Sequence, residues 1–226
     1  IGQGGKLLIP VLGVGRAQEV LLIIERLVRE GQLEKIPVYV DGMVWDVTAI
    51  HTAYPEYLNN TIRKLIFHKD ANPFLAEIFH RVGSQKERMQ VIEEQGACVI
   101  LATSGMLTGG PSVEYLKRIG DNPKNALVFV SYQGEGSLGR RIQRGEREIV
   151  FSNGMKKEIV PVRLSIYTIE GFSGHSNRRE LMNFVYKCTP RPKKILVNHG
   201  EASRCLDLAS SIHKQYRVET AAPKNL

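Results

Sequence analysis

The stretch LLIPVLGVGRAQEVLLIIERL, residues 7–27, sets the fold class of this 226-residue chain. An apolar run passes through Gly13 and Gly15 directly into a predicted amphipathic helix. That helix repeats its apolar side chains at the spacing that places them on one core-facing side: Val20, Leu21, Ile24, Leu27 and Val28. A buried strand that turns on glycine into such a helix is typical of an α/β protein with a parallel sheet.

The glycine turn after this strand has several functional interpretations. Gly13, Gly15 and Gln18 occupy the positions of a G-x-G-x-x-G turn, and Asp41 stands where the ribose-binding acid is expected. This pattern favours a dinucleotide-dependent oxidoreductase, although Gln18 departs from it. A helix N-terminus beside Arg16 is also suited to another phosphate. A tight turn without a ligand fits the sequence equally well.

The same pattern of strand and glycine turn recurs twice further along the chain. Residues 97–103 form an apolar strand that enters the turn at 104–110, and residues 125–131 enter the turn at 133–137. In an open parallel sheet such turns lie along one edge, where ligands bind. We therefore predict a ligand site at this edge, formed by these two turns and the turn at 13–16.

The sequence pattern changes near residue 146. Polar and apolar residues then alternate around Asn153 and Gly154, which predicts a β-hairpin. We place a boundary near residue 168, between an α/β lobe at 1–168 and a shorter trailing lobe at 169–226.

The trailing lobe is predicted to contain two helices and a strand. The first helix is expected to begin at Ser176 or Asn177. Its inward side chains are expected to be Leu181, Phe184 and Val185. An apolar strand follows and ends at His199, and residues 203–216 form the last amphipathic helix.

The chain is basic, with 31 Lys and Arg against 23 Asp and Glu and a net charge of +8. A surface of this charge attracts anionic partners, of which nucleic acid is the commonest. Four arginines directly follow the third glycine turn: Arg140, Arg141, Arg144 and Arg147. They form either a solvated basic face or a contact surface for nucleic acid.

Several features indicate an intracellular protein without a membrane partner. No apolar run approaches the ~20 residues that span a bilayer, and the first residues do not begin a secretory signal. Cys98, Cys188 and Cys205 form no C-x-x-C pair, which favours reduced core cysteines. Because the sequence does not start with Met, we expect it to be an internal piece of a longer polypeptide.

Two of the six histidines stand apart from the others. His175 lies in the small-residue turn SGHS at 173–176, where an exposed imidazole can donate to phosphate. His199 ends an apolar strand and precedes Gly200, a position that suits a metal ligand or an acid–base group. These two residues do not supply a complete zinc site by themselves. The other four are interpreted as structural or surface residues: His51, His68, His80 and His213.

Four motifs, in this order and at this spacing, resemble the β-CASP nucleases of the metallo-β-lactamase superfamily. They are GGKLLIPVLGVGRAQEVLLII, VILATSGMLTGGPSVEYL, GFSGHSNRREL and ILVNHGE, and the resemblance covers essentially the whole chain. It is closest to the archaeal homologues of the cleavage and polyadenylation specificity factor nuclease. Four ordered motifs are far more specific than any one of them.

The resemblance implies a two-lobed, zinc-dependent endoribonuclease. A metallo-β-lactamase lobe of αββα architecture holds two zinc ions, and a β-CASP lobe inserted into it grips RNA. Residues 1–168 would be most of the β-CASP lobe, a parallel sheet with flanking helices. Residues 169–226 would be the returning C-terminal segment of the lactamase lobe. His175 matches the motif B histidine, an acid for the leaving oxygen, and His199 matches the motif C zinc ligand, where histidine favours RNA over DNA.

The glycine turns and motif B give the residues expected to contact the RNA backbone. They are Arg16, Ser104, Gly105, Gly134, Gly136, Ser137, Ser173 and Ser176. The implied partners are RNA and, among proteins, a second copy of the chain or subunits of a processing complex, with no membrane. The implied location is the cytoplasm of an archaeal cell, or the nucleus of a eukaryotic one.

Other parts of the family pattern are missing from this sequence. The H-x-H-x-D-H signature, the remaining zinc ligands and the motif A acid should lie upstream. One histidine cannot hold two zinc ions, so the piece alone is expected to be inactive and not to bind zinc fully. The alternative function is a non-catalytic RNA-binding or scaffold subunit. The retention of His175 and His199 argues against that alternative.

Overall fold

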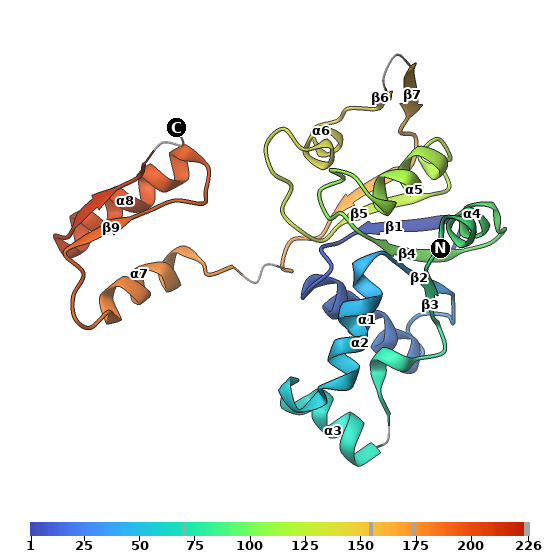
Figure 1. Cartoon of the computed structure of the whole chain (residues 1–226), viewed down its shortest axis with the longest axis horizontal. Coiled ribbons are helices and arrows are strands. Elements are labelled where there is room, and N and C mark those ends of the chain that lie inside the picture. Colours follow the sequence, from blue (N-terminus) through green and yellow to red (C-terminus); the bar gives the residue numbers. More distant parts are fainter. Residues whose placement is uncertain (70, 154–155, 173–174, 224–226) are drawn as a thin grey trace. The chain divides into compact units, whose positions relative to one another are not determined.

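The computed structural model divides the chain into two compact units, residues 1–173 and 174–226. We call them unit 1 and unit 2 and describe each by itself (Figure 1). The structure describes residues 1–69, 71–153, 156–172 and 175–223. No helix within these ranges has the length and apolar character needed to cross a membrane.

Unit 1 alternates strands and helices along the chain. Its elements are β1 (Lys6–Pro10), α1 (Arg16–Arg29), β2 (Val38–Asp41), α2 (Met43–Ala53), η1 (Pro55–Tyr57), α3 (Asn60–Lys69), η2 (Pro73–Leu75), β3 (Phe79–Val82), α4 (Gln85–Glu93), β4 (Cys98–Ala102), α5 (Pro111–Ile119), β5 (Ala126–Phe129), α6 (Leu138–Gln143), β6 (Glu148–Asn153), β7 (Lys156–Pro161) and β8 (Ser165–Thr168). Six strands form one parallel sheet in the order β3-β2-β4-β1-β5-β8. The predicted α/β class with a parallel sheet is confirmed.

Helices cover both faces of this sheet and complete a core on each. On one face α1 and α2 pack against the strands, so that Leu21 lies in the same cluster as Val38. On the other face α4, α5 and α6 pack, and Tyr115 is buried with Leu127 and Phe129. All five residues of β4 are buried. Because helices cover both faces of this strand, its side chains do not alternate between apolar and polar, and its sequence is a continuous apolar run.

The hairpin predicted around Asn153 is confirmed as the antiparallel pair β6 and β7, while Gly154 lies outside the described residues. A further element of this region was not predicted. Residues 165–168 form β8, which pairs in parallel with β5, so that Thr168 lies beside Phe129. The chain thus returns from the hairpin to add a sixth strand to the main sheet.

Gln18, the residue that departs from the dinucleotide pattern, closes the glycine turn from inside. Its buried side chain accepts a hydrogen bond of 2.7 Å from the Gly15 N–H through Oε1. Its Nε2 donates to the Gly13 carbonyl at 3.1 Å and to Thr48 Oγ1 at 3.0 Å. A pyrophosphate would need the Gly15 N–H, which is already bonded. This contact argues against the dinucleotide interpretation and explains why glutamine stands at position 18.

We expect Gln18→Ala to lower the free energy of unfolding by about 2 kcal/mol, because the turn loses all three hydrogen bonds of this side chain, of which the one to Thr48 is buried. The fluorescence of Trp45, the single tryptophan, recorded during unfolding in urea, measures this change. Gln3→Ala, at an exposed position, is the matched control and should leave the midpoint unchanged. Equal midpoints for the two variants would contradict the role assigned to Gln18.

Unit 2 is smaller and consists of α7 (Arg178–Lys187), β9 (Lys194–Leu196), α8 (Ala202–Tyr216) and β10 (Glu219–Ala221). Its two strands pair in parallel. Of the two predicted helix starts, Asn177 is the cap, because its side chain accepts the Glu180 N–H at 3.0 Å. The Glu180 carboxylate in turn accepts the Asn177 N–H at 2.8 Å, which completes a capping box.

The prediction that α7 turns Leu181 and Phe184 inward is wrong for the described chain. Leu181 is 39% exposed and Phe184 is 71% exposed. The buried apolar residues of unit 2 come from α8 and from the position directly before β10: Cys205, Ala209, Ile212 and Val218. The apolar side of α7 has the expected helical spacing, but the described part of unit 2 supplies too small a core to cover it.

Candidate functional site

The carboxyl ends of three adjacent strands form the edge at which the sequence predicts a ligand site. β1 lies between β4 and β5. After β1 the chain continues to β2, which lies on the β4 side of β1, and after β4 it crosses to β5 on the opposite side. Ligands of open α/β sheets bind at such a topological switch point. The turns at 13–16, 104–110 and 133–137 all leave the sheet here. Their predicted gathering along one edge is confirmed.

Gly105 is the position at which these turns meet. A β-carbon on Gly105 would lie only 3.0 Å from the Leu12 nitrogen and 3.4 Å from Ser131 Oγ. The Gly105 carbonyl accepts a hydrogen bond of 2.8 Å from Nε2 of Gln133, which is buried. Glycine at position 105 therefore lets the turns after β1, β4 and β5 pack closely together.

The two predicted serines of these turns are held by their own loops. Ser104 Oγ accepts the Thr108 N–H at 2.9 Å and lies 3.2 Å from the Gly109 carbonyl, to which it donates. Ser137 Oγ accepts the Arg140 N–H at 3.2 Å and so caps α6. Both hydroxyls shape the turns. A contact of either hydroxyl with RNA stays a prediction.

The remaining predicted contact residues lie in turns with little side-chain bulk. Gly134 accepts the Ser137 N–H at 3.1 Å, and Gly136 has a φ of +80°, a conformation that glycine adopts readily. Ser176 is exposed directly before the first helix of unit 2. Ser173 lies outside the described residues.

The arginines around this edge are engaged by carboxylates. Arg16 is bound to Glu19, and its guanidinium lies 5.8 Å from the centre of the Phe172 ring. Further pairs join Arg144 and Arg140 to Glu135, and Arg141 to Glu146. Exposed ion pairs of this kind contribute about 0–1 kcal/mol, so a phosphate can replace the carboxylate. Three of the four arginines that follow the third glycine turn are thus in ion pairs, whereas Arg147 donates to the Ile142 and Glu146 carbonyls, each at 3.0 Å.

Asp41 is buried under the same edge and is not available to a ribose. It is 1% exposed. Arg88 donates to both of its oxygens, at 2.8 Å and 3.1 Å, and Tyr115 Oη donates at 3.0 Å. Burial, together with the nearby Asp41 carboxylate, raises the pKa of Tyr115 well above its usual range. Sequence reasoning missed this three-residue network, because Arg88 and Tyr115 carry no local signal of their shared partner.

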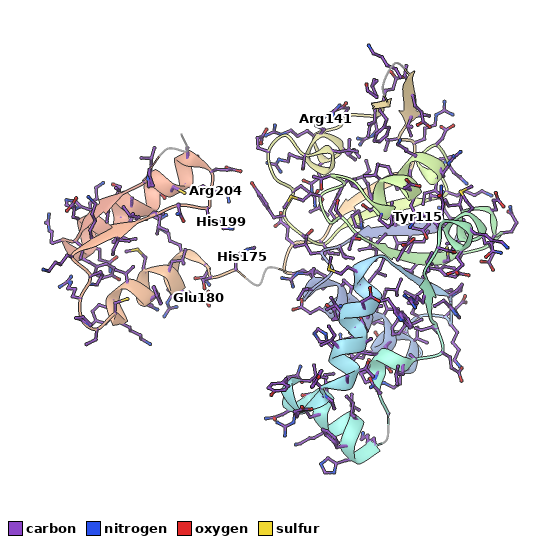
Figure 2. All side chains as sticks on the ribbon, in the orientation of Figure 1. Tyr115, Arg141, His175, Glu180, His199 and Arg204 are labelled. Carbon is purple, nitrogen blue, oxygen red and sulfur yellow. The ribbon has the colours of Figure 1, made fainter. Side chains whose placement is uncertain are left out.

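His175 and His199 lie at the same end of unit 2 (Figure 2). Arg178 near the start of α7 binds Asp207 of α8, and Tyr216 Oη at the end of α8 donates to the Met182 carbonyl at 3.1 Å. The two helices therefore run in parallel. One histidine precedes α7 and the other precedes α8, so both lie where the helices begin. Two side chains that are 24 positions apart in the sequence thus lie at the same end of the unit.

The backbone at His199 is unusual. His199 is exposed and has a φ of +65°. The next residue, Gly200, lies so close to the Cys205 side chain that a β-carbon on it would be 3.1 Å from Cys205 Sγ. Left-handed residues other than glycine are uncommon, and such conformations cluster at functional sites. The turn thus presents the imidazole outward, three residues after β9, which ends at Leu196 and not at His199 as predicted.

A metal ion at His199 would need further ligands. Within the ranges that the structure describes, no three His, Cys, Asp or Glu side chains are close enough to hold an ion. Zinc sites use three or four protein ligands. The described residues therefore offer one donor of the right chemistry but do not form a metal site by themselves.

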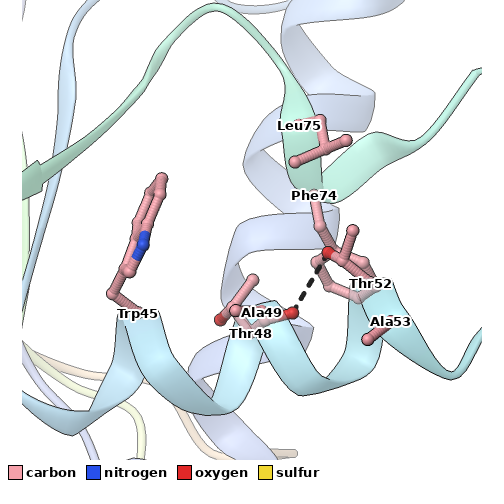
Figure 3. Close-up of a pocket in the computed structure, with 7 residues that line it drawn as sticks. All are labelled: Trp45, Thr48, Ala49, Thr52, Ala53, Phe74 and Leu75. Atoms are coloured by element: carbon pink, nitrogen blue, oxygen red, sulfur yellow. Dashed lines mark hydrogen bonds between the residues drawn. The ribbon is translucent and has the colours of Figure 1, made fainter.

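An apolar pocket lies elsewhere in unit 1, between α2 and η2 (Figure 3). It is lined by Trp45, Thr48, Ala49, Thr52, Ala53, Phe74 and Leu75. The Thr52 hydroxyl donates to the Thr48 carbonyl at 3.1 Å, and the Thr48 hydroxyl donates to the Val44 carbonyl at 2.7 Å. None of the predicted site residues lines this pocket.

Curated relatives match almost the whole chain. "Transcription termination factor FttA" of Thermococcus kodakarensis is 53% identical over 225 residues, which are 99% of this chain and 35% of the relative. The proteins of the same name from Pyrococcus horikoshii and Methanocaldococcus jannaschii are 52% and 53% identical, again with 35% of their length covered. The chain thus spans about a third of the length of these relatives.

Two family models match successive parts of the chain. The "Beta-Casp domain" model matches residues 17–142, and the model for the "Zn-dependent metallo-hydrolase RNA specificity domain" matches residues 159–223. The first covers more than half of the chain and most of the six-stranded sheet. The resemblance found in the sequence motifs is confirmed, and the chain belongs to the β-CASP family.

Proposed function

We propose that the chain is the β-CASP and C-terminal portion of a zinc-dependent endoribonuclease that cleaves RNA phosphodiester bonds. The observation that carries this proposal is the placement of His175 and His199 at one end of unit 2. The name of the matching C-terminal family and the termination-factor relatives support RNA as the substrate. The role would be 3′-end processing, transcription termination or RNA decay.

In the proposed reaction His175 acts as the general acid. The bond between phosphorus and the 3′ oxygen breaks, a water-derived oxygen attaches to phosphorus, and the imidazolium proton of His175 passes to the 3′ oxygen. The products are a 3′-hydroxyl and a 5′-phosphate. His199 would be one ligand of a zinc ion whose other ligands lie outside this chain. Bound zinc lowers the pKa of water enough to supply hydroxide near neutral pH.

Unit 2 also has the surfaces expected of a returning lactamase segment. Two-stranded parallel sheets are rare alone because both faces and edges need cover, yet β9 and β10 form such a pair. Phe184, Leu196 and Leu206 are between 59% and 71% exposed. These features support the division into a β-CASP lobe at 1–168 and a lactamase segment at 169–226, whose remaining layers come from elsewhere in the polypeptide.

The turns at the carboxyl edge of unit 1 would hold the RNA backbone. Their glycines allow close approach of phosphates, and the paired arginines can exchange a carboxylate for a phosphate. A second copy of the chain or processing-complex subunits remain the proposed protein partners. The archaeal relatives favour the cytoplasm as its location.

Salt dependence tests the RNA-binding part of the proposal. We expect the affinity of the chain for a labelled oligouridylate to fall tenfold or more between about 50 and 200 mM salt, as about three backbone contacts require. Fluorescence anisotropy at several salt concentrations measures the slope. Affinity that does not change with salt would contradict backbone recognition. Salt-dependent binding without cleavage by the full-length polypeptide would instead favour the non-catalytic subunit.

A further inference from the structure

The positive charge of the chain is concentrated in unit 2. Residues 174–226 contain ten of the 31 Lys and Arg but only four of the 23 Asp and Glu, a net charge of +6 out of +8. The glycine-turn edge, where RNA contacts are predicted, lies in unit 1, which carries the remaining +2. The main electrostatic attraction for a polyanion therefore comes from unit 2.

The charge of unit 2 gathers where its helices end. Because α7 and α8 run in parallel, the end of α7 lies beside the end of α8, where the Tyr186 and Tyr216 rings are 6.1 Å apart. The loop between α7 and β9 joins the same end. We call this surface the basic end and define it by six residues: Tyr186, Lys187, Arg191, Lys193, Lys214 and Tyr216. Except for the half-buried Tyr216, all of them are exposed.

The lysines of the basic end are available to a ligand. Three other cations of unit 2 are paired, Arg178 with Asp207, Lys194 with Glu219 and Arg204 with Glu201, whereas Arg179 and Arg217 have no ion pair among the described residues. Among the described residues, Lys187, Lys193 and Lys214 have no ion pair. One Nη of Arg191 donates a hydrogen bond to the Tyr216 carbonyl, which holds its guanidinium at the end of α8.

Helix stabilisation accounts for only part of this cluster. Cations in the last turn complement the helix dipole, which explains Lys187 and Lys214. Lys193 lies in the loop before β9 and has no such role. Tyr186 is 73% exposed beside these cations. An exposed ring among free cations is the combination that binds single-stranded nucleic acid, by stacking on a base and pairing with phosphates.

We infer that the basic end is a second RNA-binding surface, which holds the phosphate backbone of single-stranded RNA and stacks one base on Tyr186. The fifteen residues of α8 separate it from His199, roughly 20 Å at 1.5 Å per residue. It therefore contacts RNA several nucleotides away from the proposed cleavage position. This inference rests on the proposed function, because it deepens the RNA recognition of the same unit.

The test compares two triple variants of the chain with equal changes of charge. Lys187→Gln, Lys193→Gln and Lys214→Gln neutralise the basic end, and Lys35→Gln, Arg118→Gln and Lys124→Gln neutralise exposed cations of unit 1. We expect the first triple variant to bind oligouridylate at least about tenfold more weakly and to reduce the salt slope by about 2. The control triple variant should change the affinity less than about twofold. Equal weakening by both, or no weakening by the first, would overturn the inference.

A second pair of variants tests stacking separately from charge. Tyr186→Ala should weaken binding about fivefold, whereas Tyr186→Phe should bind like the wild type. Equal affinities of Tyr186→Ala and the wild type would contradict the stacking contact. Displacement of the RNA by oligo-glutamate of equal charge at equal concentration would assign the basic end to an acidic protein instead. A wild-type chain that binds no RNA would contradict the proposed function itself, whereas an inactive basic end on a chain that binds RNA overturns only this inference.

Discussion

Replacement of His175 by alanine in the full-length polypeptide is expected to reduce the rate of RNA cleavage by about 10²- to 10⁴-fold. The reason is that the departing 3′ oxygen would lose its proton donor. His175 is exposed in the loop before α7, so its removal should leave the fold of unit 2 intact. RNA affinity should change little, because the proposed phosphate contacts lie on other residues.

The matched control is His68→Ala, at an exposed position of α3. It removes an imidazole of the same chemistry from a surface with no proposed role in cleavage. Single-turnover cleavage and equilibrium RNA binding are measured for both variants. Cleavage by His175→Ala at the rate of the His68→Ala control would remove His175 from the mechanism.

Asp41→Ala should cause the largest loss of stability in unit 1, about 3–5 kcal/mol. The substitution removes the carboxylate between Arg88 and Tyr115, and so leaves a largely buried guanidinium and a fully buried hydroxyl without their shared partner. Breaking one side of such a buried pair costs more than the pair itself contributes, because the remaining charge stays desolvated. Trp45 fluorescence during urea unfolding reports on unit 1 alone, because it is the single tryptophan.

Glu114→Gln serves as the control for this measurement. Glu114 also faces Arg88, at 3.9 Å, but its side chain is 55% exposed. An exposed pair of this kind contributes about 0–1 kcal/mol. Equal losses for Asp41→Ala and Glu114→Gln would show that the buried network does not stabilise the sheet edge.

The parts of the fold that follow from local sequence were predictable. Apolar runs ending in glycine identified β1, β4 and β5, and the parallel topology then required their turns to share an edge. β8 escaped prediction because its four residues follow a hairpin, and only their distant partner, β5, makes them a strand of the main sheet. The partners of Gln18 and Asp41 are likewise tertiary contacts that no local pattern encodes.

The trailing part of the chain shows a different limit. The helical spacing of Leu181 and Phe184 indicated an apolar face correctly, but not whether this chain contains the surface that covers it. His175 and His199 could be singled out by their positions before helices. Their common location required the parallel packing of α7 and α8, which follows from tertiary contacts such as those between Arg178 and Asp207 and between Tyr186 and Tyr216.

Removal and restoration of zinc tests the assignment as a zinc-dependent endoribonuclease most directly. A labelled RNA is incubated with the full-length polypeptide before chelation, after chelation and after addition of zinc, and the ends of the products are determined. We expect cleavage to stop on chelation and to return with zinc, with 5′-phosphate and 3′-hydroxyl ends. Cleavage that continues unchanged after chelation, or products that carry 2′,3′-cyclic phosphates, would contradict it.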